Sequence, residues 1–319
     1  MITFLERLGR DLYDLLWQPS LEMALLAILA VVASRMLHRQ APAIRYILWL
    51  GLLIKPVVSL VLASPWTLFT PFLAILGDLS STIPDAGVPI RAGVNFAPPA
   101  ATQASLTMFG IGAAVWLLGG TAQITRLRRG ARRHTRGSLV AALDRAQGRI
   151  HPRQRVEVAT SALVSSPVVA GVMRPLIGLP TDLARRLSDK QAEQILLHEL
   201  AHVRRFDNLV LLIHRLVAVV FFFHPAVWLC DRMLRREADQ ACDDLAVVTT
   251  GEPRDYAIGL AELAELLNDK PYQQRRYSIM SGLGTGSSDL AVRIRRALAH
   301  RARPANPRAK LVVGLLVIC

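Results

Sequence analysis

Between Ser188 and His202 the chain reads SDKQAEQILLHELAH, and this segment sets the architecture that we expect around it. Ser188 followed by Gln191 three residues later is a capping box, a pattern typical of the start of a helix. Apolar residues then recur at helical spacing as far as Leu200. We therefore predict a helix that begins after Ser188 and carries both histidines of the segment.

The two histidines, His198 and His202, are four residues apart, so on a helix their imidazole rings point toward the same position. Two neutral imidazoles are suitable zinc ligands, and Glu199 would then lie beside an open, water-filled coordination position. The spacing therefore predicts a zinc site of the HExxH type. The competing interpretation is a pair of structural histidines on an amphipathic helix.

A catalytic zinc site usually needs a third protein ligand, and the candidates lie in the charged segment 231–244. Asp239 and Asp243 are four residues apart and share one face of a helix. Glu237 lies about 200° around the helix from Asp239, so the two cannot bind one metal ion together. Asp239 and Glu237 are therefore alternatives for the third ligand.

The apolar run 209–223 separates the two motifs. One membrane crossing here would carry the second motif to the opposite side, away from the histidines. We therefore expect a helical hairpin that turns at His224-Pro225, rather than a true fourth crossing. Upstream, the segments 155–161 and 167–180 show the alternation and the Gly and Pro punctuation of short strands, which predicts a small β-sheet.

The composition favours a membrane protein over two soluble domains. Hydrophobic residues make up 52% of the 319 residues, 19% are charged, and the mean hydropathy is +0.34. Segments 21–37, 44–63 and 106–124 have the length and apolar character of membrane spans, and 311–319 is interpreted as the start of a fourth that has been cut off. The cysteines, an odd number with unmatched spacing, exclude a disulfide scaffold.

The expected fold class is a mainly α membrane protein with three full transmembrane helices, a truncated fourth, and a cytoplasmic α+β zincin-like metallopeptidase domain. Residues 1–20 would form an amphipathic segment at the interface, or the frayed end of the first span. The remaining divisions are a membrane domain over 21–124 with an external loop 64–104, the peptidase domain over 125–300, and a basic flank with the start of the last span over 301–319.

Basic residues set the expected orientation. The run RLRRGARRHTR from Arg126 to Arg136 follows the third span, and basic loops stay in the cytoplasm. Most of the 38 lysines and arginines, which give a net charge of +14, lie between Arg126 and Lys310. There they would face anionic membrane lipid. Because the run lacks a helix-turn-helix or zinc-finger pattern, no direct contact with nucleic acid is expected.

Four motifs together resemble the BlaR/MecR-type membrane metallopeptidases, the signal transducers of β-lactam resistance and their sensorless relatives. The motifs are His198-Glu-Leu-Ala-His202, Arg204 to Asp207, His224-Pro225 with Trp228, and Asp239-Gln-Ala-Cys-Asp243. The likeness covers residues 126–319 well and the earlier spans by topology only. HtpX-type and CAAX-processing membrane proteases are more distantly similar.

The resemblance implies a zinc peptidase in which Glu199 is the general base. In these families the third ligand is usually a Glu four residues before the Asp of the second motif, and that position is Asp239 here. The shorter side chain requires its helix to lie closer to the metal. The resemblance favours Asp239, with Glu237 as the fallback and a degenerate site as the alternative. Asp243 would orient one ligand histidine, or lie on the helix surface.

Several further roles follow from shorter patterns. Val168, Val169 and Ala170 would bind an extended substrate by strand pairing. The segment 277–289 is a Gly/Ser-rich linker or, as in the sensor-type relatives, a self-cleavage site. The residues considered as oxyanion stabilisers, each with a structural role as the alternative, are Arg204, His214, His224 and Tyr256.

The function implied by the resemblance is cleavage of a cytoplasmic protein during transmembrane signalling. The substrate would be a BlaI/MecI-type transcriptional repressor or the chain itself. We expect a location in the bacterial cytoplasmic membrane, with the catalytic domain facing the cytoplasm and without a penicillin-binding sensor domain. The alternatives are a quality-control or prenyl-protein protease of the HtpX or CAAX type, and a signalling scaffold whose site has decayed.

Overall fold

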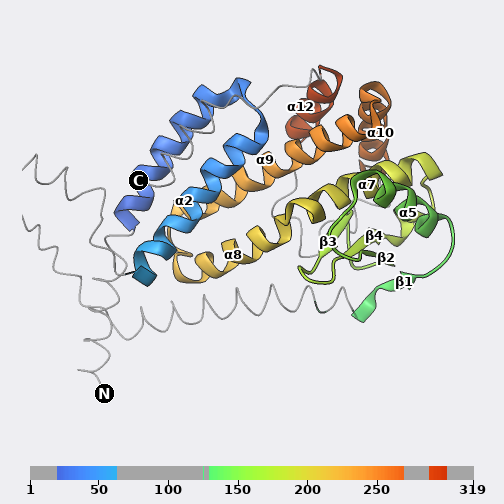
Figure 1. Cartoon of the computed structure of the whole chain (residues 1–319), viewed down its shortest axis with the longest axis horizontal. Helices are drawn as coiled ribbons and strands as arrows, with labels where there is room; N and C mark the ends of the chain where they lie inside the picture. Colours follow the sequence, from blue (N-terminus) through green and yellow to red (C-terminus); the bar gives the residue numbers. More distant parts are fainter. Residues whose placement is uncertain (1–19, 63–124, 126–128, 269–286, 300–319) are drawn as a thin grey trace, which may run out of the picture.

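The structure, a computed structural model, describes residues 20–62, 125, 129–268 and 287–299 of the chain. Helices dominate one end of the molecule, and a β-sheet lies at the other end (Figure 1). The main elements in chain order are a helix over residues 20–36, η1 (Leu37–Arg39), α2 (Pro42–Leu62), β1 (Arg132–His134), α5 (Ser138–Ile150), β2 (Glu157–Ser161), β3 (Val168–Ala170), β4 (Leu176–Pro180), α6 (Thr181–Ala184), α7 (Asp189–Arg205), α8 (Asp207–Val220), α9 (Pro225–Thr250), α10 (Pro253–Asn268) and α12 (Ser287–Leu298).

Helix α2 packs on the long helix α9 and runs alongside it (Figure 1), and the helix over residues 20–36 contributes to the same core. Their buried apolar side chains join those of α8 and α9 in one hydrophobic core. Removing this apolar surface from water is the main force that holds the four helices together. The buried members include Met23, Ala27, Ala30, Trp49, Leu52, Leu53, Val217, Phe221, Val227 and Leu234.

The sheet has four strands in the order β1-β2-β4-β3. β2 and β4 are parallel, whereas β1 and β3 run antiparallel to their neighbours, so β3 is an edge strand. Helices α5 and α7 enclose a second core with the sheet, to which Ile177, Leu179 and Leu196 contribute. The strands β2, β3 and β4 confirm the small sheet predicted for 155–161 and 167–180.

Helix α7 begins as predicted. Ser188 Oγ accepts a hydrogen bond from the Gln191 backbone N–H (3.3 Å), and Gln191 Oε1 accepts one from the Ser188 backbone N–H (2.9 Å). The helix ends at Phe206, whose φ of 59° lies in the left-handed region that large residues rarely adopt. Because α8 starts at the next residue, this turn brings Asp207 back beside the last turn of α7.

Helices α8 and α9 form the hairpin expected at His224-Pro225. His224 caps α9, since its Nδ1 accepts a hydrogen bond from the Ala226 backbone N–H (3.2 Å). Pro225 occupies the first helical position, where the missing N–H has no helical partner to lose. The hairpin returns the chain to α7, so the second motif packs against the helix that carries the histidines.

The prediction of three full transmembrane helices is wrong. Within the described part of the chain, no helix combines the length and the apolar character that crossing a bilayer requires. The first two predicted spans fall on the helix over 20–36 and on α2, whose apolar side chains pack on α8 and α9. Near the start of α2, Arg45 is buried in an ion pair with Glu237 (2.7 Å). In the described structure these two apolar runs contribute to helix packing.

Other predicted segments lie outside the described residues. These are the N-terminal segment up to residue 19, the loop 64–104, the third span 106–124 and the final segment 301–319. The proposed cleavage segment 277–289 is described only from Ser287, where α12 begins.

Candidate metal centre

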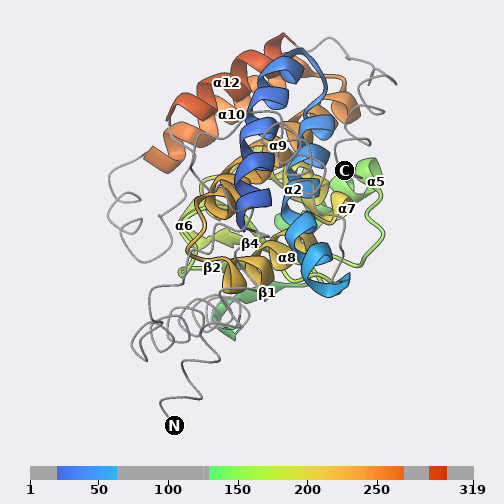
Figure 2. The ribbon, with the colours of Figure 1, turned by 90° about the vertical axis from the view of Figure 1, so that its left-hand side faces the viewer.

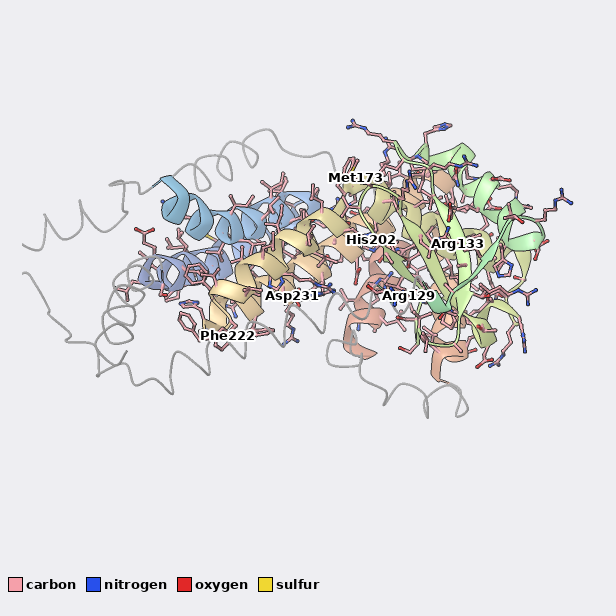
Figure 3. The ribbon with its side chains drawn as sticks, turned by 90° about the horizontal axis from the view of Figure 1, so that it is seen from below. Arg129, Arg133, Met173, His202, Phe222 and Asp231 are labelled. Carbon is pink, nitrogen blue, oxygen red and sulfur yellow. The ribbon has the colours of Figure 1, made fainter. Side chains whose placement is uncertain are left out.

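Two helices bring three ligand side chains together. His198 and His202 project from α7 and Asp239 from α9, and one nitrogen or oxygen atom of each lies within 4.8 Å of the others. The side chains are 14%, 17% and 23% exposed, so the cluster is accessible to solvent. His202 lies between the helical bundle and the sheet (Figure 3).

The structure separates the two candidates for the third ligand. Asp239 Oδ1 lies 3.5 Å from His202 Nε2. Glu237 points elsewhere, since its carboxylate pairs with Arg45 of α2 and both side chains are almost fully buried. Asp239, although one methylene shorter than Glu, therefore reaches the histidines, and Glu237 is occupied in holding α2 to α9.

Each histidine is held at Nδ1 by a carboxylate. His198 Nδ1 lies 3.1 Å from Asp243 Oδ1 and 3.2 Å from the Tyr256 hydroxyl. His202 Nδ1 lies 2.8 Å from Asp207 Oδ2. A carboxylate at Nδ1 fixes the orientation of an imidazole and leaves Nε2 available to a metal.

Asp207 is the residue that the sequence reasoning did not assign. It lay within a motif of the resemblance, but no rule of helical spacing connects it to His202, because the chain reverses at Phe206 between them. Arg205 also contacts Asp207, with Nε 3.1 Å from Oδ2. In the sequence, the only local feature that distinguishes Asp207 is its place as an acidic residue at the start of an apolar helix, where a carboxylate is favourable.

Asp243 is fixed by a helix from the far end of the sequence. Arg293 of α12 donates two hydrogen bonds to it, from Nε to Oδ2 and from Nη2 to Oδ1, both at 2.7 Å. The Tyr256 hydroxyl donates a third, also at 2.7 Å. Such a fork is the strongest common geometry between arginine and a carboxylate. α12 therefore helps to hold the carboxylate that contacts His198.

The three aspartates keep their negative charge. Burial raises the pKa of Asp239, but the hydrogen bond to His202 and the charge of Arg293 outweigh it, and the pKa lies below its ordinary value. Burial likewise raises the pKa of Asp207, yet His202 and Arg205 hold it below the ordinary value. For Asp243 the charge and hydrogen bonds of Arg293 outweigh burial in the same direction. An anionic oxygen beside two imidazoles is the donor set that zinc prefers, so these residues fit the metal.

A second group, His202, Asp207 and Cys242, lies deeper. The Cys242 thiol donates a hydrogen bond to Asp207 Oδ2 (3.7 Å), and burial raises its pKa to about 11. A protonated thiol is a poor metal ligand. Cys242 is therefore a small buried side chain that also contacts Asp207.

The profile of the family described as BlaR1 peptidase M56 matches residues 15–280. The chain belongs to this family. It is 27% identical over 213 residues to the Regulatory protein BlaR1 of Bacillus licheniformis, a match that covers 64% of the chain and 35% of that protein. It is 29% identical over 167 residues to the Methicillin resistance mecR1 protein of Staphylococcus aureus, covering 52% and 28%. The M56 family member thus spans about a third of these relatives, and the predicted BlaR/MecR-type relationship is confirmed.

In this M56 family member Glu199 and the edge strand are both connected to the helix that carries the two histidines. Glu199 follows His198 on α7 and is 8% exposed. The edge strand β3 comprises Val168, Val169 and Ala170 and contacts α7. Asn208 Nδ2 donates a hydrogen bond to the Gly171 carbonyl (2.8 Å), which ties the end of β3 to the start of α8.

The residues considered as oxyanion stabilisers are engaged elsewhere. Arg204 donates to the Ile150 carbonyl (2.7 Å), and His214 Nε2 contacts the Val227 carbonyl (3.1 Å). His224 caps α9. Tyr256 contacts His198 at Nδ1, the side held by Asp243, so it is a positioning residue for that pair.

Proposed function

We propose that the chain is a zinc metalloendopeptidase of the HExxH type. The observation that carries this proposal is the cluster of His198, His202 and Asp239, whose ligand atoms lie within 4.8 Å of one another. The carboxylates at both Nδ1 atoms support it, because they leave Nε2 free for the metal. Membership of a peptidase family supports the reaction class.

In the proposed mechanism His198, His202 and Asp239 would hold the metal. When bound, zinc would polarise the scissile carbonyl and lower the pKa of an attacking water toward neutrality. Glu199 takes the proton from that water and passes it to the leaving nitrogen. Asp243 and Asp207 keep the two imidazoles in one orientation, which maintains the geometry through the cycle.

The substrate in this proposal is an extended peptide segment. β3 is an edge strand, so one side of its backbone is not paired within the described sheet. Such an edge can bind a peptide as an added strand, with Val168, Val169 and Ala170 as the contact segment. Because β3 contacts α7, a peptide bound there would lie beside the helix that carries Glu199.

The proposed role is signalling by proteolysis. The relatives are named as a regulatory protein and a methicillin-resistance protein, and the chain is similar to both. We infer a cytoplasmic protein substrate, either a transcriptional repressor of the BlaI/MecI type or the chain itself within 277–289. Association with a bacterial membrane is part of the same proposal, with cell fractionation as its test.

Zinc content and cleavage together test the proposal. Purified wild-type protein should hold about one zinc ion per chain by elemental mass spectrometry, and His202→Ala should hold little. Glu199→Gln should keep the metal and lose cleavage of a repressor substrate, because it removes only the proton acceptor. Glu265→Gln, on the exposed face of α10, is the matched control and should keep both.

The opposite result would favour a decayed signalling scaffold, the interpretation suggested by Asp at position 239. Absence of zinc from folded wild-type protein would contradict the peptidase proposal. Cleavage of many unrelated proteins at similar rates would instead indicate a quality-control protease and would contradict the repressor-specific role.

A further inference from the structure

Helix α2 contacts both helices that carry the proposed zinc ligands, and it does so through two adjacent residues. It lies along α9 and also reaches α8 (Figure 2). Arg45 pairs with Glu237 of α9 (2.7 Å). The next residue, Tyr46, packs against Arg205, the last residue of α7, whose Cζ lies 4.8 Å from the centroid of the tyrosine ring. The contact of Arg45 fastens α2 to α9, whereas the contact of Tyr46 leads toward the metal centre.

Three successive contacts connect Tyr46 to a proposed zinc ligand. In the first, the charge of Arg205 is attracted to the face of the Tyr46 ring. In the second, Arg205 Nε donates a hydrogen bond to Asp207 Oδ2 (3.1 Å). In the third, the same oxygen lies 2.8 Å from His202 Nδ1. The carboxylate that orients His202 is therefore supported from α2 as well as from its own helix.

Two buried polar atoms beside these contacts lack a hydrogen-bond partner among the described residues. One is Asp207 Oδ1, and the other is the hydroxyl oxygen of Tyr46. The pKa of Tyr46 lies above its ordinary value, first because of burial and next because of the charge of Asp207 and hydrogen bonding toward it, although Arg205 opposes this. A donor without an acceptor thus lies beside a carboxylate that has one oxygen without a donor.

Pairing these two groups removes two unfavourable features at once. A buried polar atom without a partner costs free energy, and a hydrogen bond to a charged group is stronger than one between neutral groups. Asp207 Oδ2 already contacts His202 and Arg205, so Oδ1 is the oxygen that is open to the hydroxyl. A small rotation of either side chain is enough to make the bond.

We propose that Tyr46 is a positioning residue of the metal centre, whose hydroxyl donates a hydrogen bond to Asp207 Oδ1 while its ring supports Arg205. The inference rests on the zinc function proposed above. With both of its oxygens held, the Asp207 carboxylate cannot turn away from His202, and Nε2 of that imidazole stays directed at the metal position. Helix α2 thereby contributes to zinc affinity without contributing a ligand.

The test uses the full-length protein and the variant Tyr46→Phe, which removes the hydroxyl and keeps the ring. Zinc affinity, measured by competition with a chelator, should fall about tenfold, the lower end of the range typical of residues that orient metal ligands. In the metal-free protein the His202 Nδ1–H, observed by nuclear magnetic resonance of nitrogen-labelled histidine, should exchange with water faster, because Asp207 holds it less firmly.

Two further variants separate positioning from packing. Leu53→Val, about two turns further along α2 and buried in the helical core, should lower stability and leave both measurements unchanged. In an Asp207→Ala background, Tyr46→Phe should have no further effect on zinc affinity. The same fold-loss in both backgrounds would show that the hydroxyl does not act through Asp207 and would overturn the proposal.

The remaining outcomes distinguish this proposal from the zinc function. If the wild type binds zinc and Tyr46→Phe binds it equally well, the role of Tyr46 is overturned and the zinc function stands. If the folded wild type binds no zinc, the zinc function is contradicted, and proton exchange decides the hold on His202. Equal exchange rates in Tyr46→Phe and the wild type would then overturn that as well.

Discussion

One methylene separates Asp from Glu, and this difference decides how position 239 is interpreted. In the structure Asp239 Oδ1 is 3.5 Å from His202 Nε2, so the shorter side chain still faces the histidine pair. Glu237, which has the length typical of the family's ligand, is used instead as the counter-charge of the buried Arg45. The two acids therefore have separable roles, one at the cluster and one in the fold.

This separation gives the first prediction. Asp239→Ala should lose zinc with little change in stability, whereas Glu237→Ala should keep zinc in the folded fraction and lower the free energy of unfolding by about 3–5 kcal/mol, since Arg45 is left buried without its partner. Zinc analysis and urea unfolding of both variants measure this. Zinc lost from Glu237→Ala and kept in Asp239→Ala would contradict the assignment.

The second prediction concerns Arg293, which holds Asp243 and through it His198. Arg293→Ala should weaken zinc affinity about 10–100-fold, a range typical of residues that orient metal ligands. Arg295→Ala, on the same helix but outside this contact, is the control and should leave zinc affinity unchanged. Competition with a chelator of known affinity measures both. Equal affinities of Arg293→Ala and the wild type would rule out the positioning role.

At this scale the sequence was informative where periodicity applies. Helical spacing placed His198 and His202 on one face of their helix. It also placed Asp239 and Glu237 on opposite faces of the later helix, so that only one of them could join the histidines. It could not find Asp207 or Arg293, because one contact depends on the reversal at Phe206 and the other joins residues fifty positions apart. Contacts made through space leave no local pattern in a single sequence.

Helix ends, rather than helix interiors, position the site at the scale of the elements. The left-handed Phe206 ends α7 and starts α8, and His224 with Pro225 starts α9. Two of the helix starts were predictable, since the capping box at Ser188 and the His-Pro pair at the start of α9 are sequence signals. The turn at Phe206 was not, because a phenylalanine gives no indication of positive φ.

The contact between α8 and α9 gives a prediction of pH dependence. Burial lowers the pKa of His214 below 6.5, and nearby Asp231 opposes this only in part. Well above pH 6.5 the histidine is neutral in both the folded and the unfolded protein, so its contribution to the free energy of unfolding does not change with pH. Below it the unfolded chain takes up the proton first, and stability falls as the pH decreases.

His214→Gln should therefore show a smaller loss of unfolding free energy between pH 7.5 and pH 5.5 than the wild type, whatever its stability at pH 7.5. Urea unfolding at both pH values measures the difference. The same loss in the variant and the wild type would show that His214 does not contribute to it.

For the whole molecule, composition indicated apolar helices but not what they contact. A hydrophobic content of 52% is expected both of chains that cross a bilayer and of chains that pack long helices together. Trp49 and Leu53 of α2 pack against Phe221 and Leu234 of the α8–α9 hairpin in one core. The length and the hydropathy of an apolar run are properties of that segment alone. Whether its side chains pack against protein depends on which other segments of the chain fold beside it.

Arg45 has a practical consequence for dissecting the protein. Besides Glu237 and Gln240, its guanidinium binds the carbonyls of Leu37, His38 and Gln40, so one side chain joins the N-terminal helices to α9. A fragment beginning at residue 125 would retain every proposed zinc ligand but would expose the apolar side of the hairpin and strand a buried carboxylate. We expect such a fragment to aggregate when expressed alone and to be rescued by co-expression of residues 1–124. On this expectation residues 125–299 depend on the preceding helices for folding and could not be exchanged between proteins as an autonomous module.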